Sequence, residues 1–216
     1  MTDSHDLPPS TESLDGELMA IFPIGGVVFF PKTIIPLHIF ESRYRRLIQD
    51  VQTGDGRFIL TGFTDDTPND VGIAVKVVEQ EMMPDGRSNI LAQGLHRVRI
   101  DEYFRHYTSD DYAIAQVRAL PEEDLAGSLS MWQNLRTRLY KAFKFHFEQM
   151  SGRKLNIDEE TVNSSFTPEE AINAVCYYLE LDSQKKQTLL EENNIYKRGE
   201  KVLRILTEMN HMQYPS

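Results

Sequence analysis

The spacing of apolar residues changes once along the chain, near residue 121. Before that point, apolar runs are short and bounded by Gly, Pro or Asp, and residues 71–78 alternate in the two-residue period of a strand. After it, apolar residues recur every three or four positions, as they do on one face of a helix. The pattern therefore predicts an α+β protein whose strands come first and whose helices follow.

The first part of the chain is predicted to form a mostly antiparallel β-sheet. Gly25 and Gly26 should bend the chain between its first two strands, and Pro31 should end the second, because proline cannot donate to a sheet ladder. Pro84-Asp85-Gly86 signals a turn between two later strands. The apolar runs place strands at 18–24, 27–30, 34–39, 57–63, 71–78, 90–94, 96–100 and 112–120.

One helix is predicted early in the chain and four more after the strands. The early helix should bury a stripe and stop at the glycines of Gly54-Asp55-Gly56. Thr167-Pro168-Glu169-Glu170 has the N-cap, first-turn proline and glutamate of another helix start. The other helices are expected at 132–150, 183–192 and 197–209. The early stripe comprises Phe40, Tyr44, Leu47, Ile48 and Val51.

These elements suggest three segments. Residues 1–17 contain five acidic residues and no Lys or Arg. Such a segment buries too little apolar surface to offset the entropy of ordering, so we expect a disordered acidic tail. A β domain should then cover 18–120 and a helical subdomain 121–216, with the boundary near Pro121-Glu122-Glu123-Asp124.

Charge and cysteine content narrow the classes of function. The formal net charge of −10 makes nucleic acid an unlikely partner, since an acidic body repels phosphate. The single cysteine, Cys176, excludes an intrachain disulfide and fits a reducing compartment. Neither a signal peptide nor an apolar run long enough to cross a membrane is visible. We therefore expect a cytoplasmic protein without a membrane segment.

Sequence motifs for catalysis, cofactors or metals are not found. Residues 26–33 approach the phosphate-binding pattern G-x-x-x-x-G-K-[ST], but Pro31 replaces the second glycine and has no N–H to offer a phosphate. Cys176 has no histidine or acid nearby in sequence, and the six histidines lack metal-ligand spacing. We predict no catalytic residue, no cofactor and no metal.

Three blocks of the sequence resemble the N-terminal domain of the Lon ATP-dependent protease, which also occurs as a small stand-alone protein. They are FPIGGVVFFPKTIIPLHIFESRYRRLI, VGIAVKVVEQEMMPDGRSNILAQGLHRVRI and, more weakly, LLEENNIYKRGEKVLRILTEMN. Lys32 stands where that family usually has a glycine, and Ser42 replaces a common proline. The resemblance implies a PUA-like β-barrel or sheet domain with one early helix, followed by an α-helical bundle. It also implies a role in substrate recognition, with catalysis in later domains.

Residues and resemblance together favour a non-enzymatic module that binds other proteins or unfolded polypeptide segments. The candidate contacts are Met82 and Met83 at a hairpin tip, because methionine adapts to varied partners, and Phe30 beside the Pro31 turn. Two alternatives stay open: a PUA-like module that binds a small ligand or RNA, and an enzyme whose site is assembled only in space. The acidic charge argues against RNA.

Overall fold

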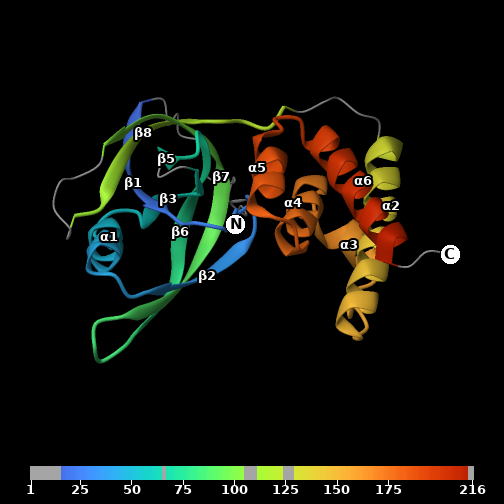
Figure 1. The fold of residues 1–216 in the computed structure, drawn as a ribbon, viewed down its shortest axis with the longest axis horizontal. Helices are drawn as coiled ribbons and strands as arrows, with labels where there is room; N and C mark the ends of the chain where they lie inside the picture. Colours follow the sequence, from blue (N-terminus) through green and yellow to red (C-terminus); the bar gives the residue numbers. More distant parts are fainter. Residues whose placement is uncertain (1–15, 65–66, 105–110, 124–128, 214–216) are drawn as a thin grey trace, which may run out of the picture.

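The structure, a computed structural model, describes residues 16–64, 67–104, 111–123 and 129–213. A β-barrel occupies one end of the molecule and a bundle of helices the other, with the bundle packed against the side of the barrel (Figure 1). Strands precede helices, apart from one early helix, so the predicted α+β class is confirmed. Residues 1–15 of the expected tail lie outside the described residues, and Gly16 already donates a hydrogen bond to Val117 in the sheet.

The main sheet has six strands in the order β2-β7-β6-β3-β1-β8. The long strand β7 also pairs with β8, so the sheet curls into a barrel. Among its described pairings, that of β1 with β3 is parallel and the others are antiparallel. A separate small hairpin joins β4 (Phe63–Thr64) to β5 (Thr67–Pro68). The six strands are β1 (Glu17–Pro23), β2 (Ile34–Ile39), β3 (Arg57–Thr61), β6 (Val71–Met82), β7 (Ser88–Phe104) and β8 (Ala113–Ala119).

Strand β2 lies at an edge of this sheet. It pairs with the first half of β7, and no other described strand pairs with its opposite side. The N–H of Gly94 donates to the carbonyl of Thr33, so every second residue from Thr33 faces β7. Pro36 therefore faces the free edge, where its missing N–H costs no sheet hydrogen bond.

The predicted strand at residues 27–30 does not form. Val28, Phe29 and Phe30 are buried in the core, but their backbone is irregular. Burial alone explains why this run is apolar. Its composition is that of a buried strand, but its backbone does not form the hydrogen bonds of a sheet. The prediction failed because an apolar run does not reveal whether its backbone has a partner.

The turn after Pro31 fastens this irregular segment to β7. Lys32 donates its N–H to the carbonyl of Gly94 at 2.8 Å and has a φ of 65°, the left-handed region that favours glycine. A Cβ on Gly94 would lie 2.6 Å from the carbonyl oxygen of Phe30, so only glycine fits there. The turn thus has a glycine-like backbone although lysine occupies it.

The early helix, α1 (Ser42–Gln52), packs on the barrel as predicted. Leu47 and Ile48 are buried, and the ring of Tyr44 stacks on that of Phe22 with centroids 3.8 Å apart. Phe40 is an exception in the predicted stripe: it precedes the helix and is 58% exposed. The spacing of apolar residues therefore predicted a stripe about one turn longer than the buried face of α1.

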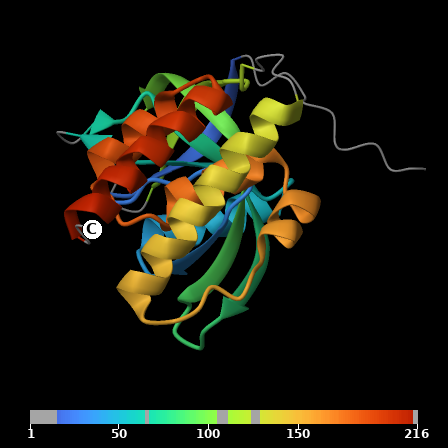
Figure 2. The same cartoon turned by 90° about the vertical axis from the view of Figure 1, so that its right-hand side faces the viewer.

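In the described part of the chain the bundle has five helices, and its core is continuous with that of the barrel. The capping box of Thr167 and Glu170 begins α4 as predicted. Helix α3 was missed because its seven residues bury no side chain and so leave no apolar stripe. Figure 2 shows α2 crossing the front of the bundle between α6 and α3. The helices are α2 (Leu129–Ser151), α3 (Glu159–Ser165), α4 (Pro168–Tyr178), α5 (Ser183–Glu191) and α6 (Ile195–Gln213).

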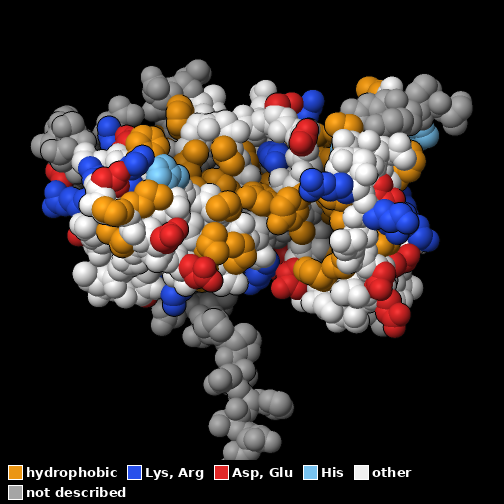
Figure 3. Space-filling model, turned by 90° about the horizontal axis from the view of Figure 1, so that it is seen from below, with side chains coloured by type: hydrophobic (Ala, Val, Ile, Leu, Met, Phe, Trp, Pro, Cys, Tyr) orange, Lys and Arg blue, Asp and Glu red, His pale blue; other side chains and the backbone are white. Residues whose placement is uncertain are grey.

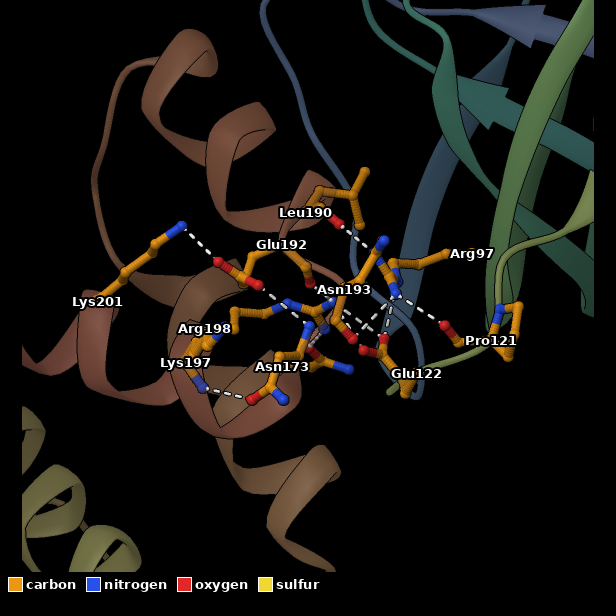
Figure 4. A network of polar contacts seen from close by, with 11 residues as sticks. Arg97, Pro121, Glu122, Asn173, Leu190, Glu192, Asn193, Lys197, Arg198 and Lys201 are labelled. Atoms are coloured by element: carbon orange, nitrogen blue, oxygen red, sulfur yellow. Dashed lines mark hydrogen bonds and ion pairs between the residues drawn. The ribbon is translucent and has the colours of Figure 1, made fainter. Parts of the chain in front are cut away.

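A buried polar network joins the barrel to the bundle (Figure 4). Arg97 of β7 and Arg198 of α6 have no exposed side-chain surface, and both bind Glu122 of the connecting segment, at 2.8 and 2.9 Å. Further Arg97 N–H groups donate to the carbonyls of Leu190 and Pro121. Burial lowers the pKa of Arg97, and the neighbouring Arg198 lowers it further. We call Arg97, Glu122 and Arg198 the Glu122 network; the division of the chain at residue 121 stays a prediction.

Candidate functional site

A groove opens on the other side of the junction between barrel and bundle. Its cavity volume is about 720 Å³, and it lies between the start of β2 and helices α2, α3 and α4. Its walls are mainly aliphatic and aromatic side chains, among them Ile34, Leu139, Phe143 and Val175. In Figure 3, hydrophobic side chains gather across the middle of this face, between barrel and bundle. We call this cavity the junction groove.

Helix α2 forms one long wall of the junction groove. Its apolar stripe starts in the core with Leu135 and Leu139, which are buried, but Phe143 and Phe147 are only partly buried. Met150, at the end of the stripe, is 50% exposed. The helix therefore uses one continuous stripe first to pack the core and then to line an open surface.

Hydrogen bonds to α2 hold the opposite wall in place. The Tyr140 hydroxyl donates to the carbonyl of Ile157 at 2.9 Å, and the Thr137 hydroxyl donates to Glu159 of α3 at 2.7 Å. Glu148 accepts the N–H of Leu155 at 3.2 Å. Because Leu155 and Ile157 line the groove, these bonds fix its width without filling it.

The barrel contributes the third wall through the edge strand β2. Ile34 lines the groove and is 46% exposed. Pro36 and His38 share its outward face, since side chains of a strand alternate, and Leu91 of β7 lies opposite Pro36. The apolar surface thus continues from the groove onto the outside of the barrel.

A buried cation lies at one end of this apolar cavity. Arg136 of α2 lines the groove, is 9% exposed, and donates from Nη1 to the carbonyl of Phe166 at 2.8 Å. Its Nε has no hydrogen-bond partner. Among the residues that the structure describes, no carboxylate lies within 4.0 Å of its guanidinium nitrogens. Glu180 also lines the groove, but it is exposed and is not paired with Arg136.

A buried histidine contributes to the same wall. His146 is 5% exposed, and its Nδ1 lies 3.0 Å from Oδ1 of Asn210. The Asn210 amide nitrogen donates to the carbonyl of Ala142, so its oxygen faces the ring and Nδ1 carries the proton. His146 is therefore a packed side chain of the interior with a fixed hydrogen-bond partner.

The residues proposed from sequence do not line the junction groove. Met82 is 56% exposed and Met83 half-buried at the tip of the β6–β7 hairpin, so both are accessible, and their role stays a prediction. Phe30 is wrong as a candidate contact, because it has no exposed surface and packs in the core. The partial exposure of Phe143 and Phe147 has no signal in sequence, because a core stripe and a groove wall have the same spacing.

The other side chains that could react or bind a metal are either buried or far apart from one another. Cys176 is fully buried, and burial raises the pKa of its thiol to about 12, which keeps it protonated and a weak nucleophile at neutral pH. In the described ranges, no three His, Cys, Asp or Glu side chains gather closely enough to hold a metal ion. None of the described helices is both long and apolar enough to span a bilayer.

A barrel and a bundle with an apolar groove at their junction make up a binding domain, since ligand sites favour concave apolar surfaces between structural units. Residues 19–208 match the family described as the ATP-dependent protease La (LON) substrate-binding domain, and the chain belongs to this family. The resemblance noted in the sequence is therefore confirmed.

The relatives and solved structures agree with this assignment. The chain is 24% identical over 199 residues to the Lon protease of Brevibacillus choshinensis, covering 87% of this chain and 24% of the relative. It is 27% identical over 206 residues to the Lon protease of Rhizobium meliloti, covering 90% of this chain and 24% of the relative. The chain thus spans about a quarter of the length of these proteases.

Two solved structures share the fold. The N-terminal domain of the Mycobacterium avium complex Lon protease matches with a TM-score of 0.70 and 14% identity, over 89% of this chain and 99% of that one. A Lon N-terminal domain protein from Xanthomonas campestris matches with a TM-score of 0.61 and 17% identity, over 87% of this chain and 97% of that one. The barrel and bundle are thus the family fold.

Proposed function

We propose that this protein binds exposed apolar segments of other proteins and that the junction groove is the binding site. The observation that carries the proposal is an open, apolar cavity of about 720 Å³ between barrel and bundle. Membership of a substrate-binding family supports a polypeptide as the ligand. The net charge of −10 disfavours RNA, the main alternative.

The exposed apolar side chains of the groove set the strength of binding. Ile34, Met150 and Phe166 line it and are 46%, 50% and 37% exposed. Burying one such side chain completely contributes roughly 1.5–3 kcal/mol, and these are already partly buried. Association and ordering costs offset much of that gain, so a single client segment should bind weakly and exchange quickly. Weak binding with fast exchange is what transient capture of unfolded segments requires.

We further propose that the chain acts without catalysis of its own. The buried, protonated Cys176 is not available as a nucleophile, and the family described for residues 19–208 is a substrate-binding one. The cytoplasm remains our proposed location, on the basis of the single cysteine.

The hairpin tip is a second candidate surface. Met82 is 56% exposed there, and its flexible thioether suits varied apolar partners. The junction groove is favoured over it because a concave site buries more of an extended ligand than a projecting tip does.

Paired substitutions test the groove against the tip. The probe is reduced, carboxymethylated α-lactalbumin, a permanently unfolded chain, titrated by fluorescence anisotropy. Ile34→Ser with Phe166→Ser should weaken binding more than tenfold. Leu18→Ser is the matched control, because Leu18 is an exposed strand residue, 59% accessible, that does not line the groove.

The results separate the two surfaces. Met82→Ser with Met83→Ser should change affinity less than the groove pair does, and moderate salt should change it little, since apolar burial is not screened. Unchanged binding in the groove pair, with loss in the methionine pair, would move the site to the hairpin tip. Equal binding by every variant would refute both surfaces.

A further inference from the structure

The unpaired guanidinium of Arg136 indicates which chemical group the groove receives. Arg97 and Arg198, the other deeply buried arginines of the junction, both bind the carboxylate of Glu122. Arg136 is 9% exposed and has only the carbonyl of Phe166. A buried charge without a counter-charge is costly, so a site that retains one gains most from a ligand that supplies a carboxylate.

The guanidinium of Arg136 has one nitrogen that can still receive a ligand. Nη1 is engaged with the Phe166 carbonyl, and Nε has neither a partner nor exposed surface. Nη2 makes no hydrogen bond within the described residues and is not enclosed, so it is the nitrogen that would donate to an oxygen of a carboxylate, in a charge-assisted hydrogen bond.

The position of Arg136 along the groove identifies the source of the carboxylate. Groove-lining residues of α2 run from Arg136 to Ser151, which corresponds to roughly 22 Å of helix, or about six to seven residues of extended peptide. Arg136 is the first of them and is buried, whereas Met150 and Ser151 at the other end are exposed. The cation therefore lies at the more buried end of this wall, and a chain whose terminus pairs with it would extend along α2 toward the exposed end.

We propose that the junction groove captures the free C-terminus of a client polypeptide. The last several side chains lie on the apolar walls, and the terminal α-carboxylate forms an ion pair with Arg136 through Nη2. Chain termini are usually exposed and mobile, so a client presents this group before it is unfolded throughout. This inference rests on the proposed function, because it specifies which apolar segments the same groove prefers.

The decisive test compares peptides that differ by one terminal group. A fluorescein-labelled octapeptide of alternating Phe, Leu and Ser is prepared as the free acid and as the C-terminal amide. A third peptide is amidated and carries one central Glu in place of Ser. The acid should bind about tenfold more tightly than the amide, the range for a charge-assisted hydrogen bond that replaces an unpaired charge. The net charge of −10 repels a negatively charged peptide and so would favour the amide. Tighter binding of the acid would therefore have to come from a local contact and not from the overall charge of the protein.

Variants on α2 then assign the preference to one residue. Arg136→Met should abolish the preference, so that the acid and the amide bind this variant with equal affinity. Arg136→Gln provides the same comparison should Arg136→Met fold poorly. Arg138→Met is the control, because Arg138 is exposed, pairs with Glu200 and does not line the groove; it should preserve the preference.

Every other outcome of the peptide experiment refutes a specific part of the proposal. Equal binding of acid and amide to the wild-type protein would refute capture of the terminus while leaving apolar recognition standing. An Arg136-dependent gain for the Glu peptide alone would make a side-chain carboxylate the ligand and refute the terminal one. Binding of none of the three peptides would refute the proposed function together with this inference.

Discussion

The two sides of the barrel–bundle junction contain the same residue type in opposite circumstances. On one side, Arg97 and Arg198 are fully buried and share the carboxylate of Glu122. On the other, Arg136 lines an open groove and lacks a carboxylate partner within the described part of the chain. The side whose charges are satisfied by the chain itself fixes the barrel to the bundle. The side whose charge is unsatisfied is the one for which we propose a ligand.

The largest expected effect comes from breaking the satisfied side. Glu122→Gln removes the carboxylate that two buried guanidinium groups share, and should lower the free energy of unfolding by about 3–5 kcal/mol in urea titrations. Glu123→Gln, the exposed neighbour, is the matched control and should change stability by less than about 0.5 kcal/mol. Similar losses in both variants would mean that the Glu122 network does not hold the junction.

A pH dependence should follow from His96, which precedes Arg97 in β7 and has no partner for its buried Nε2. Burial lowers the pKa of His96, and Arg57 and Lys32 lower it further. The unfolded chain binds this proton near pH 6.5 and the folded chain only at lower pH. Stability from this group is therefore complete above pH 6.5 and falls as the pH drops toward the folded pKa, by at most about 1.4 kcal/mol per pH unit.

The measurement for His96 is a series of urea titrations between pH 7.5 and 5.5. His96→Gln should show a flatter decline of unfolding free energy than the wild-type protein over that range. Parallel curves for the two proteins would show that His96 binds its proton equally well in the folded and unfolded states.

The open side should respond much less than the Glu122 network. Arg136→Met removes an unpaired buried charge but also the donor to the Phe166 carbonyl, so the two effects oppose each other and stability should change by less than about 1 kcal/mol. Arg97→Met should cost at least about 2 kcal/mol, because the carbonyls of Leu190 and Pro121 lose their donor. Equal losses in calorimetric melts would remove the distinction between the two sides.

The smallest effect concerns Lys32, at the barrel edge of the groove. Its φ of 65° is strained for a side chain with a Cβ. Lys32→Gly should therefore raise the free energy of unfolding by about 0.5–1 kcal/mol, after the greater flexibility of glycine in the unfolded chain is subtracted. Lys32→Ala keeps the strain and removes the charge, so it should not be stabilising; a gain in this control would assign the effect to charge.

Local signals in the sequence were sufficient for much of the fold. The capping box at Thr167 marked the start of α4, and the stripe through Leu47 placed α1. Helix α3 was missed because it is short and has no fully buried side chain, so the sequence shows no apolar stripe there. Residues 27–30 were misread because burial selects apolar side chains whether or not the backbone has a strand beside it.

The candidate site was much less accessible to sequence reasoning. Ile34, Arg136 and Phe166 come from distant parts of the chain and meet only through the packing of bundle on barrel. No spacing rule distinguishes Arg136, without a counter-ion, from Arg97, whose partner is Glu122. Exposed methionines at a turn could be found from sequence, which is why the hairpin tip was proposed first.

Pro36 interrupts the unpaired edge of the barrel sheet. Aggregation-prone extended chains can add as new strands to the unpaired edge of a sheet. Strand β2 is such an edge, and it lies beside the groove. A strand that arrived there would find a gap in the row of donors at Pro36, between Ile34 and His38, and could not form an unbroken ladder. The exposed edge of the barrel is therefore a poor template for the addition of further strands.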